Sequence, residues 1–310
     1  MRQESPDVKL RTFVWGTVWT LVGLALVFHV AGGWYFSSEL IEDGFKIQAD
    51  DLAVPSGDYE LEQVSYTSPL GAMDAWYLPG GGTTWVIHVH GKGATPAEAE
   101  PMFTPLQDAG YPQLAITYRN DDDQPEDPTG YYQYGATEWE DVAGAVAYAL
   151  DNGAEHIVLN GYSTGGSHVV SFMYRQSLDT VSGILLDSPN LDLSETVDFA
   201  ASQRELPLVP FNVPPTLSTV AQFFTSLRIG VNWKSLDYVA RSDTSLRQPV
   251  LIHHGTADQT VPVTESIELA EAQPDLVRLI QVEGADHVGS FEIDPAKYIS
   301  EVLGFLQEVG

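Results

Sequence analysis

The stretch HIVLNGYSTGG at residues 156–166 passes from apolar, β-branched side chains directly into glycines spaced around a serine. The apolar run predicts a buried strand, and the Gly-x-Ser-x-Gly pattern after it predicts a sharp turn into a helix. Gly161 and Gly165 suit such a turn, because a side chain at either position would collide with the neighbouring strand and helix. We therefore predict that Ser163 stands exposed at the end of a strand.

An exposed serine becomes a nucleophile only when a histidine takes its proton and a carboxylate orients that histidine. Both residue types follow in the order Ser, Asp, His. Asp258 comes directly after the strand-like run PVLIHHGTA at 249–257, and His287 comes after VRLIQVEGAD at 277–286. Both would lie just past the carboxyl ends of strands, where the sites of parallel α/β sheets form. We predict Ser163, Asp258 and His287 as nucleophile, acid and base.

Two other carboxylates are alternatives to Asp258. Asp286 precedes His287 directly, but neighbouring residues rarely face each other's ring nitrogens. Asp187 stands at another strand end, in Asp187-Ser188-Pro189. We favour Asp258 over both.

Four other histidines, His88, His90, His253 and His254, could suggest a metal site. The chain has no cysteine and no His-Glu-x-x-His pattern, and these histidines occupy two strand ends of similar sequence. We interpret them as structural and predict neither a metal nor an organic cofactor.

These segments together resemble the α/β-hydrolase superfamily. GYSTGG at 161–166 matches its nucleophile elbow, HGTADQTVP at 254–262 its acid loop and GADH at 284–287 its histidine loop. The resemblance extends from about residue 59 to the C-terminus. It implies a mostly parallel central sheet with helices on both faces.

The resemblance extends to HGKG at 90–93, which looks like the superfamily's oxyanion loop. It implies that the backbone N–H groups of Lys92 and Thr164 hold the negative oxygen of the tetrahedral intermediate. Gly93 is an alternative to Lys92 as the donor.

Strand and helix patterns alternate along the same part of the chain, which independently favours a mostly parallel sheet covered on both faces. An antiparallel hairpin is predicted first, at 59–79. The expected strands are 84–89, 113–118, 156–160, 181–186, 250–254 and 276–282, and the expected helices are 137–150, 263–272 and those that begin near 96, 165 and 294.

Residues 13–36 contain no charged side chain and are rich in valine, leucine and aromatic residues. A helix of this length reaches about 36 Å, enough to cross a hydrocarbon core of about 30 Å. Basic residues precede the span and acidic ones follow it, namely Arg2, Lys9 and Arg11 against Glu39, Glu42 and Asp43. The sequence predicts a single-pass anchor in the cell membrane, with a cytoplasmic N-terminus and an extracytoplasmic catalytic domain. A cleaved signal peptide is the alternative, but the apolar region is longer than usual and no small-residue cleavage site follows it.

The predicted organisation is a cytoplasmic segment at 1–12, the anchor at 13–36, a linker at 37–57 and a hydrolase domain at 58–310. Within the domain, residues 190–248 form a long apolar excursion, which we interpret as a helical lid that shapes the substrate site. An acidic loop at 120–134 could suggest calcium binding. It has Glu126 where an EF-hand loop needs glycine, so a solvated loop is favoured.

The formal charge of −29 argues against nucleic acid as a partner, because its phosphates would be repelled. The absence of cysteine excludes a thiol nucleophile and a disulfide framework. We expect a serine hydrolase that cleaves carboxylic esters, with a small-molecule or lipid ester as substrate. A serine peptidase or amidase, and an inactive binding protein of the same fold, are the alternatives.

Overall fold

The computed structural model describes residues 6–47, 54–57, 59–176, 178–206, 211–242 and 246–310. Parts of four predicted regions lie outside the described residues: the N-terminal segment at 1–5, the linker at 48–53, the hydrolase domain at 58 and 177, and the lid at 207–210 and 243–245. The chain forms two compact units. One comprises Met1–Gly44 and Ala201–Val231, the other Phe45–Ala200 and Asn232–Gly310.

An eight-stranded sheet in the order β1-β2-β4-β3-β5-β6-β7-β8 forms the centre of the larger unit. β2 is antiparallel to β1 and β4, and every other pair is parallel. This confirms the mostly parallel sheet and the initial hairpin. The strands are β1 Glu62–Ser68, β2 Gly71–Leu78, β3 Thr84–Val89, β4 Gln113–Ile116, β5 His156–Tyr162, β6 Val181–Asp187, β7 Val250–Gly255 and β8 Val277–Val282.

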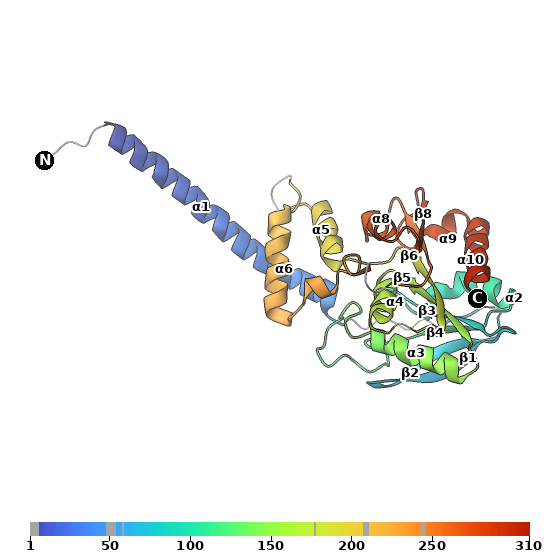
Figure 1. The fold of residues 1–310 in the computed structure, drawn as a ribbon. Coiled ribbons are helices and arrows are strands. Elements are labelled where there is room, and N and C mark those ends of the chain that lie inside the picture. The colour runs from blue at the N-terminus through green and yellow to red at the C-terminus, as the bar shows by residue number, and fades with distance from the viewer. Residues whose placement is uncertain (1–5, 48–53, 58, 177, 207–210, 243–245) are drawn as a thin grey trace. The chain divides into compact units, whose positions relative to one another are not determined.

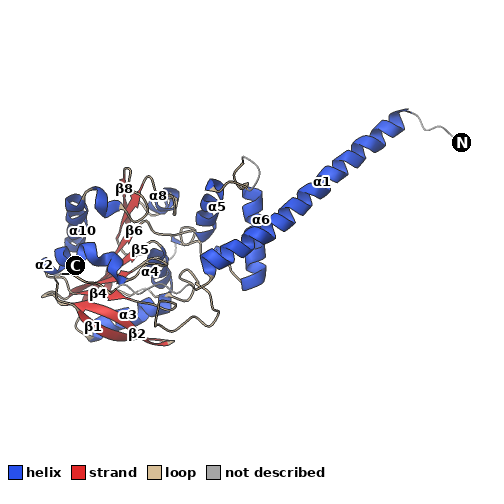
Figure 2. Cartoon of the chain, turned by 180° about the vertical axis from the view of Figure 1, so that it is seen from behind, coloured by secondary structure: helices blue, strands red, loops and turns tan. Residues whose placement is uncertain are grey.

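Helices cover the sheet in two groups. α3 and α4 pack against each other and against β1 and β5, and α2 packs against α10. Figures 1 and 2 show these two pairs on different sides of the strands. The helices of this unit are η2 Pro96–Ala99, α2 Glu100–Asp108, α3 Trp139–Asp151, α4 Thr164–Arg175, α5 Leu193–Gln203 (whose last residues belong to the smaller unit), η3 Trp233–Ser235, α8 Val263–Ala272, α9 Ser290–Ile293 and α10 Pro295–Val309.

The central strands are buried on both faces, which explains their nearly continuous apolar sequences. Val86 of β3 is paired with Val158 of β5, and both belong to the core cluster that includes Phe305 of α10. Successive side chains of a strand point to opposite faces, so the next pair, Ile87 and Leu159, faces the other helical layer. The strand ends that carry Ser163 and Asp258 are therefore held by core on both sides.

The smaller unit contains α1 Pro6–Glu39, its continuation η1 Leu40–Phe45 (whose last residue belongs to the larger unit), and α6 Pro215–Ile229, which packs against α1. Within the described residues, one helical stretch, Phe13–Phe45, is long and apolar enough to cross a membrane; its most apolar 18-residue window has a mean hydropathy of 1.8 and contains no buried residue. The predicted loop-like linker is wrong for residues 37–45, which are helical. The physical reason is that Ile41 and Phe45, one helical turn apart, both bury apolar side chains.

The predicted lid at 190–248 contains α5, α6 and η3. Its middle part, Ala201–Val231, belongs to the same compact unit as α1, and the parts before and after it belong to the larger unit.

Candidate active site

Ser163 occupies the turn between β5 and α4, with φ of 49° and ψ of −120°. A positive φ is uncommon for a residue with a side chain, and holding it costs on the order of 1–3 kcal/mol. The turn needs its flanking glycines. A Cβ on Gly165 would lie 2.1 Å from the carbonyl oxygen of Val89, and one on Gly161 would lie 2.7 Å from the Cα of Gly166. Local sterics therefore explain the glycine spacing seen in the sequence.

The structure brings the three predicted residues into one chain of hydrogen bonds. Nε2 of His287 lies 2.8 Å from Oγ of Ser163, and Nδ1 of the same ring lies 2.8 Å from Oδ2 of Asp258. An ionised carboxylate can only accept, so the Nδ1–H donates to Asp258 and Nε2 accepts the serine proton. This is the tautomer in which a histidine can deprotonate a serine.

Asp258 is held ionised and in place by its loop. Its Oδ1 accepts hydrogen bonds from the backbone N–H groups of Thr260 and Val261, at 2.8 and 2.9 Å. Burial alone would raise its pKa, but the hydrogen bonds from His254, His287 and the Val261 N–H outweigh it and hold that pKa well below the ordinary value. The carboxylate is thus available to orient His287 and to stabilise its charged form.

His254 is a site residue whose role the sequence did not suggest. Its ring is completely buried, with Nδ1 2.7 Å from Oγ of Ser266 and Nε2 3.2 Å from the carbonyl oxygen of Val261. The Nε2–H therefore donates, and it also faces Oδ2 of Asp258 at 3.4 Å. His254 is a positioning residue for Asp258. The only sequence signal is its place at the strand end, four residues before the aspartate.

The two alternative acids do not contact the ring of His287. Oδ1 of Asp286 accepts from the backbone N–H of His287 at 2.8 Å. Asp187 accepts from the hydroxyl of Ser290 at 3.0 Å, and burial raises its pKa to about 7. The geometry therefore favours Asp258.

The loop expected to hold the oxyanion lies against Ser163. A Cβ on Gly91 would be 3.0 Å from the Cβ of Ser163, which is tighter than most Cβ contacts, so glycine suits this close approach. Glu98 fixes the loop by accepting the Gly91 N–H at 2.8 Å, a contact that the sequence did not indicate. The ammonium group of Lys92 lies 5.4 Å from the centre of the Tyr132 ring. Thr164 begins α4, where the first N–H groups of a helix lack intrahelical partners.

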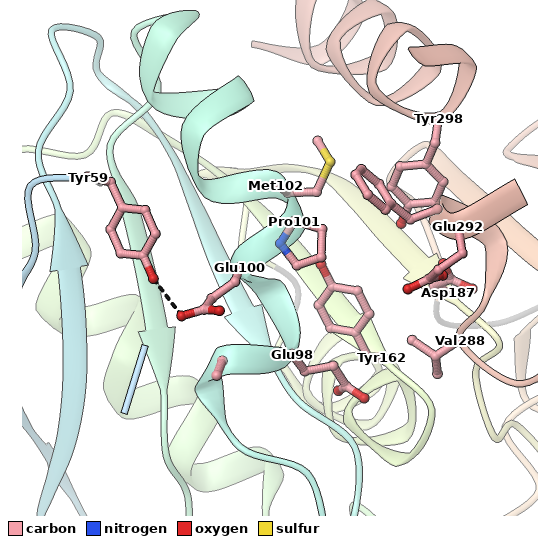
Figure 3. Close-up of a pocket in the computed structure, with 12 residues that line it drawn as sticks. Tyr59, Glu98, Glu100, Pro101, Met102, Tyr162, Asp187, Val288, Glu292 and Tyr298 are labelled. Atoms are coloured by element: carbon pink, nitrogen blue, oxygen red, sulfur yellow. Dashed lines mark hydrogen bonds between the residues drawn. The ribbon is translucent and has the colours of Figure 1, made fainter. Parts of the chain in front are cut away.

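A cavity of about 640 Å³ adjoins these residues (Figure 3). Tyr162 and Val288, the chain neighbours of Ser163 and His287, contribute to its wall. Its lining combines apolar and carboxylic side chains: Tyr59, Ala97, Pro101, Met102, Phe291 and Tyr298 with Glu98, Glu100, Asp187 and Glu292. Figure 3 shows the Tyr59 hydroxyl directed at Glu100, a hydrogen bond of 2.6 Å. The carboxylic lining disfavours anionic groups beside the site.

The remaining polar residues singled out in the sequence have partners within the protein. His88 is bonded to Gln113 and Asn160, and His90 to Asp121. Asp127, from the acidic loop, is paired with the buried Arg119 at 3.3 Å, and Arg119 also contacts Glu140 and Asp141.

Comparison with known proteins agrees with this fold. The sequence profile of the prolyl oligopeptidase family matches residues 102–310, about two thirds of the chain, including all three hydrogen-bonded residues. The chain belongs to the prolyl oligopeptidase family. This family member shares the α/β-hydrolase fold with an esterase of Pyrococcus furiosus, which is 22% identical and has a TM-score of 0.67; the match covers 86% of this chain and 100% of the esterase.

Two further matches are a peptidase structure and an uncharacterised protein. An acylaminoacyl peptidase of Pyrococcus horikoshii is 16% identical with a TM-score of 0.61, over 81% of this chain and 42% of the peptidase. The uncharacterised protein YfhR of Escherichia coli is 20% identical over 250 residues, 78% of each chain. The comparisons support a hydrolase of this superfamily acting on ester or peptide bonds.

Proposed function

We propose that this protein is a serine hydrolase that cleaves carboxylic esters through a covalent acyl-enzyme. The observation that carries the proposal is the continuous set of hydrogen bonds from Ser163 through His287 to Asp258, beginning at a serine held in a strained turn. A buried carboxylate, a histidine in the accepting tautomer and a half-buried serine hydroxyl together supply what acyl transfer requires.

In the first half of the reaction, Nε2 of His287 takes the proton of Ser163 while Oγ attacks the ester carbonyl. The oxyanion is held by the backbone N–H groups of Lys92 and Thr164, the first donated from the loop that Glu98 fixes. His287 then gives its proton to the leaving alcohol, and the acyl group remains on Ser163. Asp258 stays ionised and stabilises the positive ring.

In the second half, His287 takes a proton from water, and the resulting hydroxide attacks the acyl-enzyme. The same backbone donors hold the second oxyanion. Collapse of this intermediate breaks the bond to Oγ, which recovers its proton from His287, and the acid leaves. The carboxylic wall of the neighbouring cavity repels acids, which favours release of the product and selects against anionic substituents near the serine.

We further propose that α1 is an uncleaved membrane anchor, with the catalytic unit outside the cell. The support is the uncharged stretch at 13–36 in a helix whose most apolar 18-residue window contains no buried residue, with basic residues before it and acidic residues after it. An anchored esterase would meet amphiphilic esters at the bilayer surface, so lipid or acyl esters are the proposed substrate class.

Amide hydrolysis is the second candidate, favoured by the match to the prolyl oligopeptidase family. The same residues would act, with the leaving amine in place of the alcohol.

The test uses the full chain in detergent micelles, labelled with a fluorophosphonate probe and assayed with p-nitrophenyl esters of graded length and with acyl-peptide anilides. Ser163→Ala should abolish labelling and turnover while the circular dichroism spectrum stays unchanged. Ester turnover well above anilide turnover supports an esterase, and the reverse order supports a peptidase. Labelling that persists in Ser163→Ala would refute the assignment of the nucleophile.

A further inference from the structure

The segment 206–227 of this acidic protein has no charged residue and exposes large apolar side chains. Between Leu206 and Leu227 the sequence contains no charged residue, although the formal charge of the whole chain is −29. Phe211, Phe223 and Leu227 are 67%, 62% and 69% exposed. Outside α1, the described residues hold only two other large apolar side chains that are exposed, Val54 and Ile293. Such a concentration of exposed apolar surface needs a partner.

The segment is packed on α1 in a parallel register. His29 lies beside Thr216, with Nε2 and Oγ1 2.9 Å apart, and a Cβ on Gly32 would be 3.1 Å from Leu217. Further along, the rings of Trp34 and Phe224 are 5.5 Å apart. The contacts end with Ser37 and Thr225, whose hydroxyls are 3.0 Å apart, and with Ser38 and Arg228, 2.8 Å apart. Successive residues of α6 therefore contact α1 residues of rising number, and Figure 1 shows α6 crossing the C-terminal part of α1 obliquely.

The first charged residues after the uncharged parts of α1 and α6 lie close together. On α1 the first charged residue after the apolar span is Glu39, and on α6 it is Arg228, which contacts Ser38, the residue before Glu39. The guanidinium of Arg228 also lies over the ring of Trp34 at 4.6 Å, an aromatic residue of the kind found at membrane interfaces. Two helices from distant parts of the sequence thus share one boundary between uncharged and charged surface. A flat water–lipid interface produces such a shared boundary.

The polar groups of His29 and Thr216, at the deeper end, are satisfied within the unit. The Nδ1–H of His29 donates to the carbonyl oxygen of Ala25 at 2.8 Å, so Nε2 accepts from the hydroxyl of Thr216. Pro214 and Pro215, at the start of α6, have no N–H to leave unpaired. These arrangements suit an environment that offers no water.

We infer that α6 is embedded in the outer leaflet of the bilayer that α1 spans, with Phe223 and Leu227 facing lipid. This inference rests on the proposed membrane anchor. His29 is seven residues before Phe36, so the start of α6 reaches roughly 10 Å below the end of the apolar span. Arg228 lies at the headgroups, where its long side chain reaches the polar region. The occupant of the exposed face of α6 is therefore the acyl-chain region of the leaflet.

The parallel register makes the inference specific, because depth must change in order along one face of α6. Thr219, Phe223 and Leu227 are all exposed and lie at successive turns, about 6 Å apart along the helix. Thr219 is expected to lie deepest and Leu227 nearest the headgroups.

The test places a nitroxide label at single cysteines in the full chain, which has no native cysteine, reconstituted in phosphatidylcholine nanodiscs. The variants are Thr219→Cys, Phe223→Cys and Leu227→Cys. Trp19→Cys in α1 reports on the anchor, and Ile293→Cys, an exposed apolar position in the other unit, is the matched control. Collision rates with oxygen, which concentrates in lipid, and with a water-soluble nickel chelate give the depth of each label.

We expect the oxygen-to-nickel ratio to be severalfold higher at Phe223 than at Ile293, and to fall from Thr219 through Phe223 to Leu227. A nickel-accessible label at Phe223, with Trp19 still in lipid, would overturn this inference and leave the anchor intact. A label at Trp19 in water would instead refute the anchor on which it rests. Protection of Phe223 from both reagents, in a chain that is dimeric in the disc, would assign the face to a second copy and also overturn the inference.

Discussion

Replacing Asp258 with asparagine is expected to lower kcat/KM by about 10⁴-fold, which corresponds to about 5.4 kcal/mol of lost transition-state stabilisation. The hydrogen bonds around the carboxylate determine how the amide must lie. Oδ1 receives the N–H groups of Thr260 and Val261, so the amide oxygen must take that place, since an NH₂ group would face two donors.

The amide NH₂ is then directed at Nδ1 of His287, where Oδ2 accepts in the native protein. Nδ1 becomes an acceptor, so the ring proton moves to Nε2, which can no longer take the proton of Ser163. The Nε2–H of His254 faces the same NH₂ group, which adds a repulsive contact. The substitution thus preserves the shape of the site and reverses the tautomer of its base.

The assay is kcat/KM for a p-nitrophenyl ester across pH, together with the rate of fluorophosphonate labelling and the melting temperature. Asp286→Asn is the matched control, because Asp286 lies beside His287 in sequence but accepts only from backbone N–H groups. It should change kcat/KM by less than about fivefold, since it leaves the tautomer alone. Activity above a tenth of wild type in Asp258→Asn, or a larger loss in Asp286→Asn, would refute the assignment of the acid.

Three further outcomes are expected. Gly165→Ala should fold poorly or lose nearly all activity, because the added Cβ would lie 2.1 Å from the Val89 carbonyl oxygen; soluble expression and labelling measure this, and a variant of normal stability and rate would contradict it. Glu98→Ala should lower kcat by about 10–100-fold through a displaced oxyanion loop, whereas Glu98→Gln, which keeps an acceptor for the Gly91 N–H, should retain most of the rate; equal losses in both would show that the charge matters instead. Burial raises the pKa of Asp187 to about 7, so the folded state holds this proton more tightly than the unfolded state does. The free energy of unfolding of the wild type therefore falls as the pH rises from about 4 to 7. Asp187→Asn should therefore gain stability relative to wild type at pH 8 and lose that gain near pH 4, and denaturant unfolding that gives the same difference at both pH values would contradict the raised pKa.

The features that could be predicted from the sequence are those set by local sterics and burial. Strands β3, β5 and β7 could be predicted from their apolar runs, because a strand buried on both faces has few polar side chains. The turn at Ser163 could be predicted because only glycine fits at positions 161 and 165, where a Cβ would clash with nearby backbone atoms. The prediction of a loop at 37–45 was wrong because the sequence does not show that Ile41 and Phe45 become buried, Phe45 against the rings of Tyr134 and Trp233.

The arrangement of the site depended on contacts between segments far apart in the chain. Asp187, Asp258 and Asp286 all follow strands, and only the order β6-β7-β8 with the loop geometry past each strand places Asp258, and not the others, at Nδ1 of His287. The contacts of Glu98 with Gly91 and of α6 with α1 likewise lack a local signature, and the contact of His254 with Asp258 has only the spacing of four residues at the strand end. A hydrogen bond or a helix contact depends on distances of a few tenths of an ångström. Sequence patterns record which face of an element is buried, and the packing of the whole chain sets those distances.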